Sequence, residues 1–108
     1  MADEATRVVR NEESSRYEVW VGDTVAGYSE YREQGGRTVF KHTEVDDAYE
    51  GQGLGTTLAA GALDDAMGRG QTLVPVCPFI ANYVRKHNQY TPYVRWPGDG
   101  AGSGDDGA

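Results

Sequence analysis

Hydrophobic and polar residues alternate along the N-terminal part of the chain, as they do in strands that bury one face. In the clearest case, Tyr17, Val19 and Val21 share one side of a segment, and Glu18 and Trp20 share the other. This spacing predicts a half-buried strand.

Short turns separate this strand from similar segments. Gly22-Asp23 favours a tight reversal, and Gln34-Gly35-Gly36-Arg37 predicts the next turn. Gly27 falls inside a strand, where a glycine indicates a bulge or a close approach of another backbone. Strands joined by such short turns form an antiparallel meander. The expected strands are Arg7–Asn11, Tyr17–Val21, Thr24–Tyr31 and Thr38–Val45.

The hydrophobic period then lengthens to about 3.6 over Ala48–Gly70, which predicts an amphipathic helix that ends at its last glycines. Asp64, Asp65 and Arg69 are expected to face away from the apolar stripe. The stripe consists of Leu54, Leu58, Ala62, Leu63, Ala66 and Met67.

An apolar run at Gln71–Val76 follows and is typical of a buried strand. The order strand, helix, strand favours a parallel pair with a right-handed crossover. Pro78 opens a second helix, with Arg85 and Lys86 outside. Thr91–Trp96 is either a last strand or an irregular closing segment. The helix face expected to be buried consists of Phe79, Ile80, Tyr83, Val84 and His87.

Length and composition indicate one domain. A chain of 108 residues, 38% of them hydrophobic, holds a single modest core, and we assign residues 7–96 to it. We expect residues 1–6 to form a flexible N-terminus. Residues 97–108 are rich in glycine and aspartate and have nothing to bury, so a disordered tail is expected there.

Net charge and cysteine content limit the classes of partner and the cellular compartment that we expect. A net charge of −7 argues against a nucleic-acid partner; it suits a cationic substrate such as an amine, or serves solubility alone. No apolar run has membrane-spanning length and no signal peptide is evident, so no membrane partner is expected. The single cysteine cannot form an internal disulfide, which fits a reducing, cytoplasmic location. Two histidines and one cysteine give no metal-ligand spacing.

Three glycines at alternate positions, Gly51, Gly53 and Gly55, stand directly before the apolar stripe. Amide groups at a helix N-terminus favour anions, and glycine leaves them unobstructed. A Walker loop is excluded because no lysine follows, and the dinucleotide fingerprint because Thr56 stands at its last glycine. The hypothesis is a loop that holds a phosphate or pyrophosphate. The alternative is a glycine-rich turn that only begins an ordinary helix.

A second feature lies at the end of the next predicted strand. Pro75 has no N–H to donate, so strand pairing must break or bulge there. Because Pro78 prefers the first helical position, Cys77 is the expected N-cap, with its sulfur near the amides of Phe79 and Ile80. Such a position stabilises a thiolate, although most free cysteines are buried and inert.

Taken together, these segments resemble the minimal, single-domain branch of the GNAT N-acetyltransferase superfamily, over roughly Val8 to Val94. The resemblance implies a small α/β acetyltransferase-like fold: an antiparallel meander, then strand-helix-strand-helix with a splayed central strand pair that holds acetyl-CoA. The segments are Phe40-x-His42-Thr-Glu-Val45, Tyr49-Glu-Gly-Gln-Gly-Leu-Gly55, Val74-Pro-Val-Cys-Pro-Phe-Ile80 and Tyr83-Val-Arg-Lys-His87.

The resemblance also implies residue roles. The backbone at Glu44 and Val45 would bind the thioester carbonyl and the pantetheine arm, and Cys77 would inherit the catalytic role suggested for this branch. Glu50 stands where the family usually has Arg or Gln. The pyrophosphate would bind to the amides of Gly51, Gln52, Gly53, Leu54, Gly55 and Thr56.

Other candidate roles stay open. In the larger superfamily a tyrosine protonates the leaving thiolate, but that position holds Val84 here, with Tyr83 one residue away. Lys86, beside Arg85 and His87, contacts cofactor phosphates or simply lies on a charged helix face.

His42 alternates with Phe40 and Glu44 in its strand and is either a base or a structural residue. Glu44 either orients an amine and receives its proton through water, or only flanks the loop.

The leading hypothesis is therefore an acetyl-CoA-dependent N-acetyltransferase that acts on an unidentified primary amine, directly or through Cys77. The alternative is a coenzyme A or acyl-CoA binding module without efficient transferase activity. A third hypothesis is an interaction domain that uses the tyrosines of the meander, Tyr17, Tyr28 and Tyr31.

Overall fold

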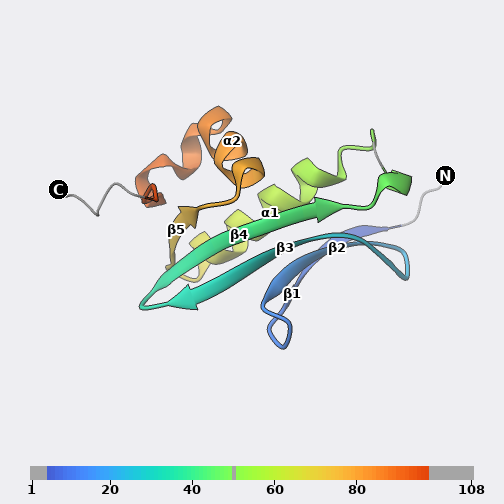
Figure 1. The fold of residues 1–108 in the computed structure, drawn as a ribbon, viewed down its shortest axis with the longest axis horizontal. Helices are drawn as coiled ribbons and strands as arrows, with labels where there is room; N and C mark the ends of the chain where they lie inside the picture. The colour runs from blue at the N-terminus through green and yellow to red at the C-terminus, as the bar shows by residue number, and fades with distance from the viewer. Residues whose placement is uncertain (1–4, 50, 98–108) are drawn as a thin grey trace.

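The structure is a computed structural model that describes residues 5–49 and 51–97. Five strands form one sheet in the order β1-β2-β3-β4-β5, with both α-helices on the same side of it (Figure 1). The elements are β1 Thr6–Asn11, β2 Arg16–Val21, β3 Thr24–Gln34, β4 Arg37–Val45, η1 Asp47–Tyr49, α1 Leu54–Gly68, β5 Thr72–Pro75, α2 Pro78–Lys86 and η2 Asn88–Tyr93.

The predicted topology is confirmed. Strands β1 to β4 pair antiparallel in sequence order, and β5 pairs parallel with β4 after the α1 crossover. The hairpin between β3 and β4 turns at Gly35 and Gly36, which have φ of 58° and 80°, a conformation that glycine adopts at little cost.

A bulge in β3 confirms the prediction at Gly27. Val19 pairs with Gly27 and Trp20 with Val25, so Ala26 is the extra residue on β3. A Cβ on Gly27 would lie 2.7 Å from the carbonyl oxygen of Glu44, so the backbones of β3 and β4 approach closely at this point. Gly27 therefore lies next to a bulge and also permits a close approach of two backbones, the two possibilities that the sequence indicates.

A second bulge, in β4, was not predicted. Tyr31 pairs with Phe40 and Glu30 with His42, which leaves Lys41 as the extra residue. The expected alternation of Phe40, His42 and Glu44 on one side is therefore wrong. Phe40 is fully buried under the helices, whereas His42 and Glu44 are exposed on the outer face of the sheet.

The core lies between the sheet and α1. The predicted apolar stripe of the helix is buried, except that Met67 is only half-buried. The helix begins at Leu54, directly behind the three glycines, as the glycine-loop hypothesis requires; Gly51 and Gly53 have positive φ and cannot continue a right-handed helix. Residues 47–49 form the separate turn η1.

The sequence predicts that Asp65 and Arg69 face away from the apolar stripe, but both residues also make hydrogen bonds to the sheet. Tyr17 donates a 2.8 Å hydrogen bond to the carboxylate of Asp65, and burial together with this acceptor raises the pKa of Tyr17. Arg69 lies between Asp65, at 3.1 Å, and Glu33, at 2.7 Å. This network fastens the end of α1 to β2 and β3.

Strand β5 is the last strand of the sheet and pairs with β4. Its outer side is covered by the closing segment, in which the amide of Arg95 donates to the carbonyl of Leu73 at 2.8 Å. Val94 bridges to Leu73, and the preceding residues form η2, so the irregular form of the closing segment is observed. Tyr90 of η2 is buried in the core.

Most of the predicted N-terminal lead-in and of the predicted tail lies outside the described residues, as does Glu50. Within the part of the chain that the structure describes, no helix is both long and apolar enough to cross a membrane.

Candidate functional site

Strands β4 and β5 separate at Pro75. Their last paired residues are Phe40 and Pro75, and the carbonyl oxygen of Phe40 then accepts from the amides of both Val76 and Cys77, at 3.1 and 2.8 Å. Beyond this point β4 continues to Val45 with no strand paired to this edge among the described residues. The predicted splay is therefore present, and it leaves the end of β4 with one open edge.

The backbone of Val45 points to this open edge. The amide of Asp46 donates to the carbonyl of Ala26 on β3 at 2.7 Å, and successive residues of a strand direct their backbone groups to opposite sides. Val45 and Thr43 therefore direct their backbone groups away from β3. Glu44 pairs toward β3, so of the two predicted backbone donors only Val45 presents its N–H to the opening.

The side chain of Glu44 lies on the outer face of the sheet. It accepts a 2.7 Å hydrogen bond from the hydroxyl of Tyr28, and His42 Nε2 is 3.6 Å from its other oxygen. The bond from Tyr28 lowers the pKa of Glu44 and raises that of Tyr28. Glu44 and His42 thus form an exposed cluster that does not face Cys77.

The glycine loop presents bare amides at the start of α1. Gly53 is the N-cap, with φ of 74°, and no described heavy atom would lie within 4 Å of a Cβ on Gly51 or Gly53. Among the described residues, the amides of Gly55 and Thr56 have no hydrogen-bond acceptor. The amide of Gln52 instead donates to Tyr49. These open N–H groups fit an anion such as a diphosphate.

Gly55 leaves room for an aromatic side chain of α2. A Cβ at this position would lie 2.7 Å from the ring of Phe79, so the aromatic side chain packs directly against the backbone of α1. Phe79 is 41% exposed, and the prediction that it is buried is wrong. This contact brings the N-terminal ends of α1 and α2 together.

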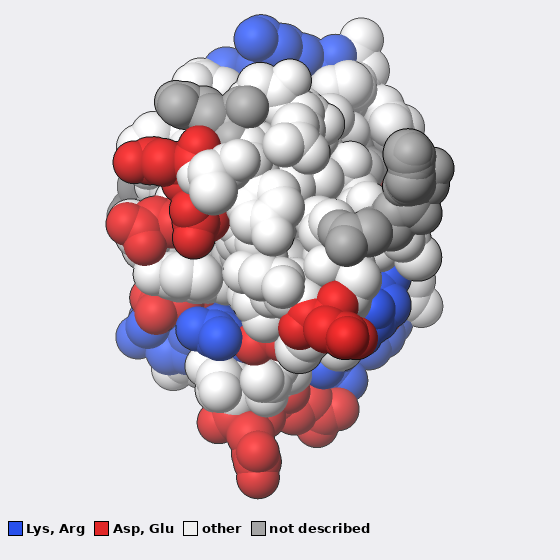
Figure 2. All heavy atoms as spheres, turned by 90° about the vertical axis from the view of Figure 1, so that its right-hand side faces the viewer, with Lys and Arg blue, Asp and Glu red and all other residues white. Residues whose placement is uncertain are grey.

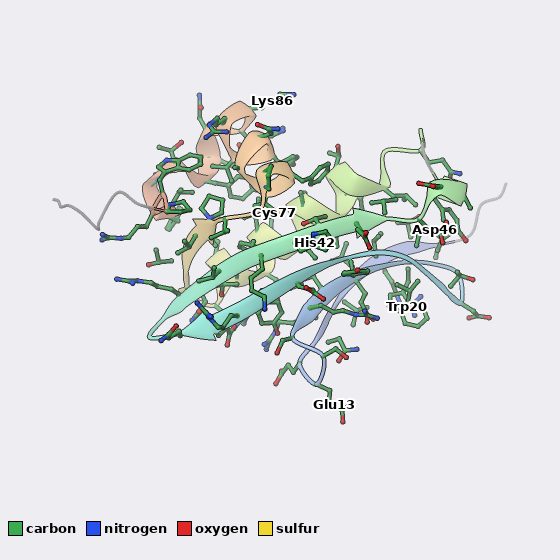
Figure 3. All side chains as sticks on the ribbon, in the orientation of Figure 1. Glu13, Trp20, His42, Asp46, Cys77 and Lys86 are labelled. Carbon is green, nitrogen blue, oxygen red and sulfur yellow. The ribbon has the colours of Figure 1, made fainter. Side chains whose placement is uncertain are left out.

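Cys77 is the N-cap of α2, as predicted, but its thiol does not cap the helix. Its Sγ donates to the hydroxyl oxygen of Thr43 at 3.3 Å instead of approaching the amides of Phe79 and Ile80. Figure 3 shows Cys77 where β5 leads into α2, next to β4. The cysteine is only 3% exposed.

The second half of α2 lies farther from the loop. Lys86 is exposed in its last turn (Figure 3), about 10 Å along the helix from Phe79 at 1.5 Å per residue. Val84, at the position of the expected acid, is buried, and the ring of Tyr83 stacks on His87 with centroids 3.9 Å apart. Lys86 is therefore about two helical turns beyond Phe79, the residue that contacts Gly55.

A groove of about 490 Å³ opens beside the end of β4, and it includes neither Cys77 nor the glycine loop. Figure 2 views the end of the molecule where β4 finishes, and acidic side chains border an uncharged central area there. The groove is lined by Arg16, Val25, Ala26, Gly27, Tyr28, Glu44, Val45, Asp46 and Asp47. Three carboxylates against one guanidinium make it a favourable place for a cation.

Sequence reasoning missed Thr43, which touches Cys77. The bulge at Lys41 turns this threonine toward the helices, and no residue in the segment signals a bulge. Within residues 5–49 and 51–97, no group of three His, Cys, Asp or Glu side chains is arranged to hold a metal.

The splayed strands and the glycine loop define a small α/β domain of the acetyltransferase type. The family model described as GCN5-related N-acetyl-transferase matches residues 16–93, and the chain belongs to this family. The family indicates an acetyltransferase that uses acetyl-CoA as co-substrate.

One solved structure supports the fold. It is the NMR solution structure of a GCN5-like candidate N-acetyltransferase from Staphylococcus aureus, which matches with a TM-score of 0.64. The match covers 84% of this chain and 89% of that chain, at 20% sequence identity. No curated protein matches the chain significantly.

Proposed function

We propose that the protein transfers the acetyl group of acetyl-CoA to a primary amine. The observation that carries the proposal is that two contacts connect the open edge of β4, Cys77 and the glycine loop. Cys77 contacts Thr43 on the open edge of β4, and Phe79, two residues after Cys77, contacts Gly55 in the glycine loop. A thioester placed along this edge would have its diphosphate at one end and Cys77 at the other.

In this proposal the diphosphate binds to the amides between Gly51 and Thr56. The strongest donors are those of Gly55 and Thr56, because neither is used within the described part of the chain and the helix dipole adds to their attraction. The amide of Gln52 contributes less, since it already donates to Tyr49. Lys86 would at most meet an outer phosphate of the nucleotide.

The amide of Val45 would stabilise the oxyanion that forms on the acetyl carbonyl. In the direct route, the neutral amine attacks the carbonyl carbon, the carbon–sulfur bond breaks, and the leaving thiolate receives the amine proton through water. In the covalent route, Cys77 attacks first and releases coenzyme A as the thiol. The amine then attacks the acetyl-cysteine and displaces the Cys77 sulfur.

The acidic groove supports an amine as the acceptor. Glu44, Asp46 and Asp47 would attract an ammonium to the end of β4 on the side away from the helices. The amine must lose a proton before it attacks, and the nearby carboxylates would pass that proton to solvent.

A matched pair of variants tests the cofactor site. Thr56→Pro removes one amide at a helix position where proline is tolerated, and we expect coenzyme A to bind about tenfold more weakly. Thr56→Ala keeps the amide and should bind like the wild type. Coenzyme A titrations followed by amide chemical shifts measure both. Equal affinities of the two variants would contradict binding at these amides.

Turnover is tested with acetyl-CoA and a panel of primary amines, with release of free thiol as the readout. Amine-dependent release supports the transferase. Binding without release across the panel would favour the coenzyme A binding module, an alternative supported by the buried Val84 at the expected acid position. In Cys77→Ala, undiminished turnover would assign the direct route.

A further inference from the structure

A row of three hydrogen-bonding side chains leads from Cys77 into the sheet. The Sγ of Cys77 donates to Thr43 Oγ1 at 3.3 Å, and Thr43 Oγ1 lies 2.9 Å from Ser29 Oγ. Ser29 is fully buried and Cys77 nearly so, while Thr43 is half-buried at the open edge of β4. The three residues come from the start of α2, from β4 and from β3.

The β4 bulge creates this row. Ser29 and Tyr31 face the helices, and their partners on β4 are Thr43 and Phe40. Without an extra residue, positions three apart would face opposite sides of a strand. Lys41 supplies that extra residue, so Thr43 joins Phe40 on the face that holds Cys77.

The hydroxyl of Thr43 can form a hydrogen bond with Cys77 in both its thiol and its thiolate state. A threonine hydroxyl has one proton to donate and accepts up to two hydrogen bonds. When Cys77 is a thiol, it donates to Thr43, and Thr43 donates to Ser29. When the thiol proton leaves, both hydroxyls can rotate, so that Ser29 donates to Thr43 and Thr43 donates to the sulfur. No group in the row then loses its partner.

Ionisable side chains around the row are directed elsewhere. Tyr17 on β2 pairs with Ser29, but its hydroxyl is held by Asp65 and Arg69 of the α1 end. On β4, Lys41 and its exposed neighbours His42 and Glu44 lie away from the helices.

On the helices, Tyr83 of α2 stacks on His87, and Tyr90 of η2 donates to Asp64. The first turn of α1 carries no ionisable side chain. The hydroxyls of Thr43 and Ser29 are therefore the polar side chains in hydrogen-bond contact along the row.

From this arrangement we infer that Thr43, backed by Ser29, is a positioning residue that fixes the sulfur of Cys77 at the open edge of β4 and stabilises its thiolate. The inference rests on the proposed function for its purpose, because a fixed thiolate is needed only if Cys77 takes the acetyl group. The hydrogen-bond row itself does not depend on that function.

The single cysteine makes a direct measurement possible. Protein labelled with ¹³C at the cysteine Cβ gives one signal, whose position reports thiol ionisation across a pH series. In Thr43→Val, which keeps the shape of the side chain but removes the hydroxyl, we expect the midpoint of this titration to rise by about one pH unit, a tenfold loss of thiolate at a given pH. Thr43→Ser restores the hydroxyl and should return the midpoint to the wild-type value.

Ser29→Ala provides an independent variant, since it leaves Thr43 in place but removes its backing group. A smaller upward shift is expected, and amide spectra of each variant report whether the fold is intact. Thr43→Val with an unshifted midpoint would overturn the inference. If Thr43→Val does not fold, an unshifted midpoint in Ser29→Ala would do so.

The two proposals fail in different ways. A shifted midpoint without any amine-dependent thiol release would leave the positioning role in place and remove the transferase. Amine-dependent release in the wild type, together with unshifted midpoints in the variants, would keep the transferase and remove the positioning role.

Discussion

At the scale of single residues, Glu18 is a buried carboxylate on the outer face of the sheet. It is 4% exposed and accepts hydrogen bonds from Arg16 Nε at 2.8 Å, Trp20 Nε1 at 3.0 Å and Asn11 Nδ2 at 3.1 Å. Burial alone would raise its pKa, but the three donors outweigh burial and the pKa is lowered. The charge therefore stabilises the sheet in the form present at neutral pH.

Glu18→Gln should cost about 2 kcal/mol at neutral pH, because the guanidinium loses its charge partner and one of the remaining donors faces an amide NH₂. A lowered folded pKa means that this stabilisation is complete above the unfolded value, about 4.3, and is lost as the pH falls through the folded value. The variant and the wild type should therefore converge in acid. Urea unfolding at neutral pH and near pH 3 measures the difference.

The control for this experiment is Glu13→Gln. Glu13 is exposed in the β1–β2 turn and should change stability little at either pH. A loss in Glu18→Gln that is equally large at both pH values would show that the charge is not what stabilises this position.

At the scale of elements, the two bulges change which side chains share a face of the sheet. The Ala26 bulge and Gly27 lie near the start of β3, where the strand approaches β4 closely, and a Cβ at Gly27 would meet backbone atoms of β4. Gly27→Ala should therefore lower the free energy of unfolding by about 1–3 kcal/mol.

Gly68→Ala is the matched control for Gly27→Ala. No heavy atom of the described residues would lie within 4 Å of its Cβ, and alanine favours the helix by about 0.5–1 kcal/mol relative to glycine. Urea unfolding should thus give changes of opposite sign. Equal small changes in both variants would contradict the close approach at Gly27.

The elements could be predicted because their signals are local. Alternation gives the strands, the change of period gives α1, and Pro78 marks the start of α2. The bulge at Lys41 could not be predicted, because nothing in the local sequence distinguishes a bulged lysine from one in a regular strand. A one-residue insertion reverses every side chain after it, so the alternation that the sequence predicts for Phe40, His42 and Glu44 breaks at His42.

The candidate site also has some features that the sequence predicts and others that it does not. The amides of the glycine loop and the N-cap position of Cys77 follow from glycine and proline, whose backbone preferences are visible in the sequence. The contacts of Phe79 with Gly55 and of Cys77 with Thr43 join segments far apart in the chain. They depend on tertiary packing, for which a single sequence carries no local signal.

At the scale of the whole molecule, helices cover one side of the sheet, and within residues 5–49 and 51–97 the other side bears only the side chains of its own strands. On the outer side, guanidinium groups lie over aromatic rings, Arg7 over Trp20 at 5.0 Å and Arg16 over Tyr28 at 4.9 Å. These pairs shield aromatic surface without another layer. The stability of the domain therefore depends on the single core under α1, α2 and the closing segment.

The closing segment should accordingly be essential to the fold. A chain ending at His87 would lose Tyr90, which is buried in the core and donates to Asp64 at 2.7 Å, and would uncover the edge of β5. Loss of one buried aromatic side chain costs about 3–5 kcal/mol, a large share of the 5–15 kcal/mol typical of a domain. Thermal unfolding followed by circular dichroism should show no cooperative transition, or one at a much lower temperature.

A chain ending at Pro97 keeps every described residue of the closing segment and should unfold like the full chain. Removing residues 98–108, which make up all of the predicted tail except Pro97, thus serves as the control for the shorter chain and as a test of the domain boundary. If the chain ending at His87 unfolded at the wild-type temperature, β5 would be held by β4 alone, and the core would have to be complete without Tyr90.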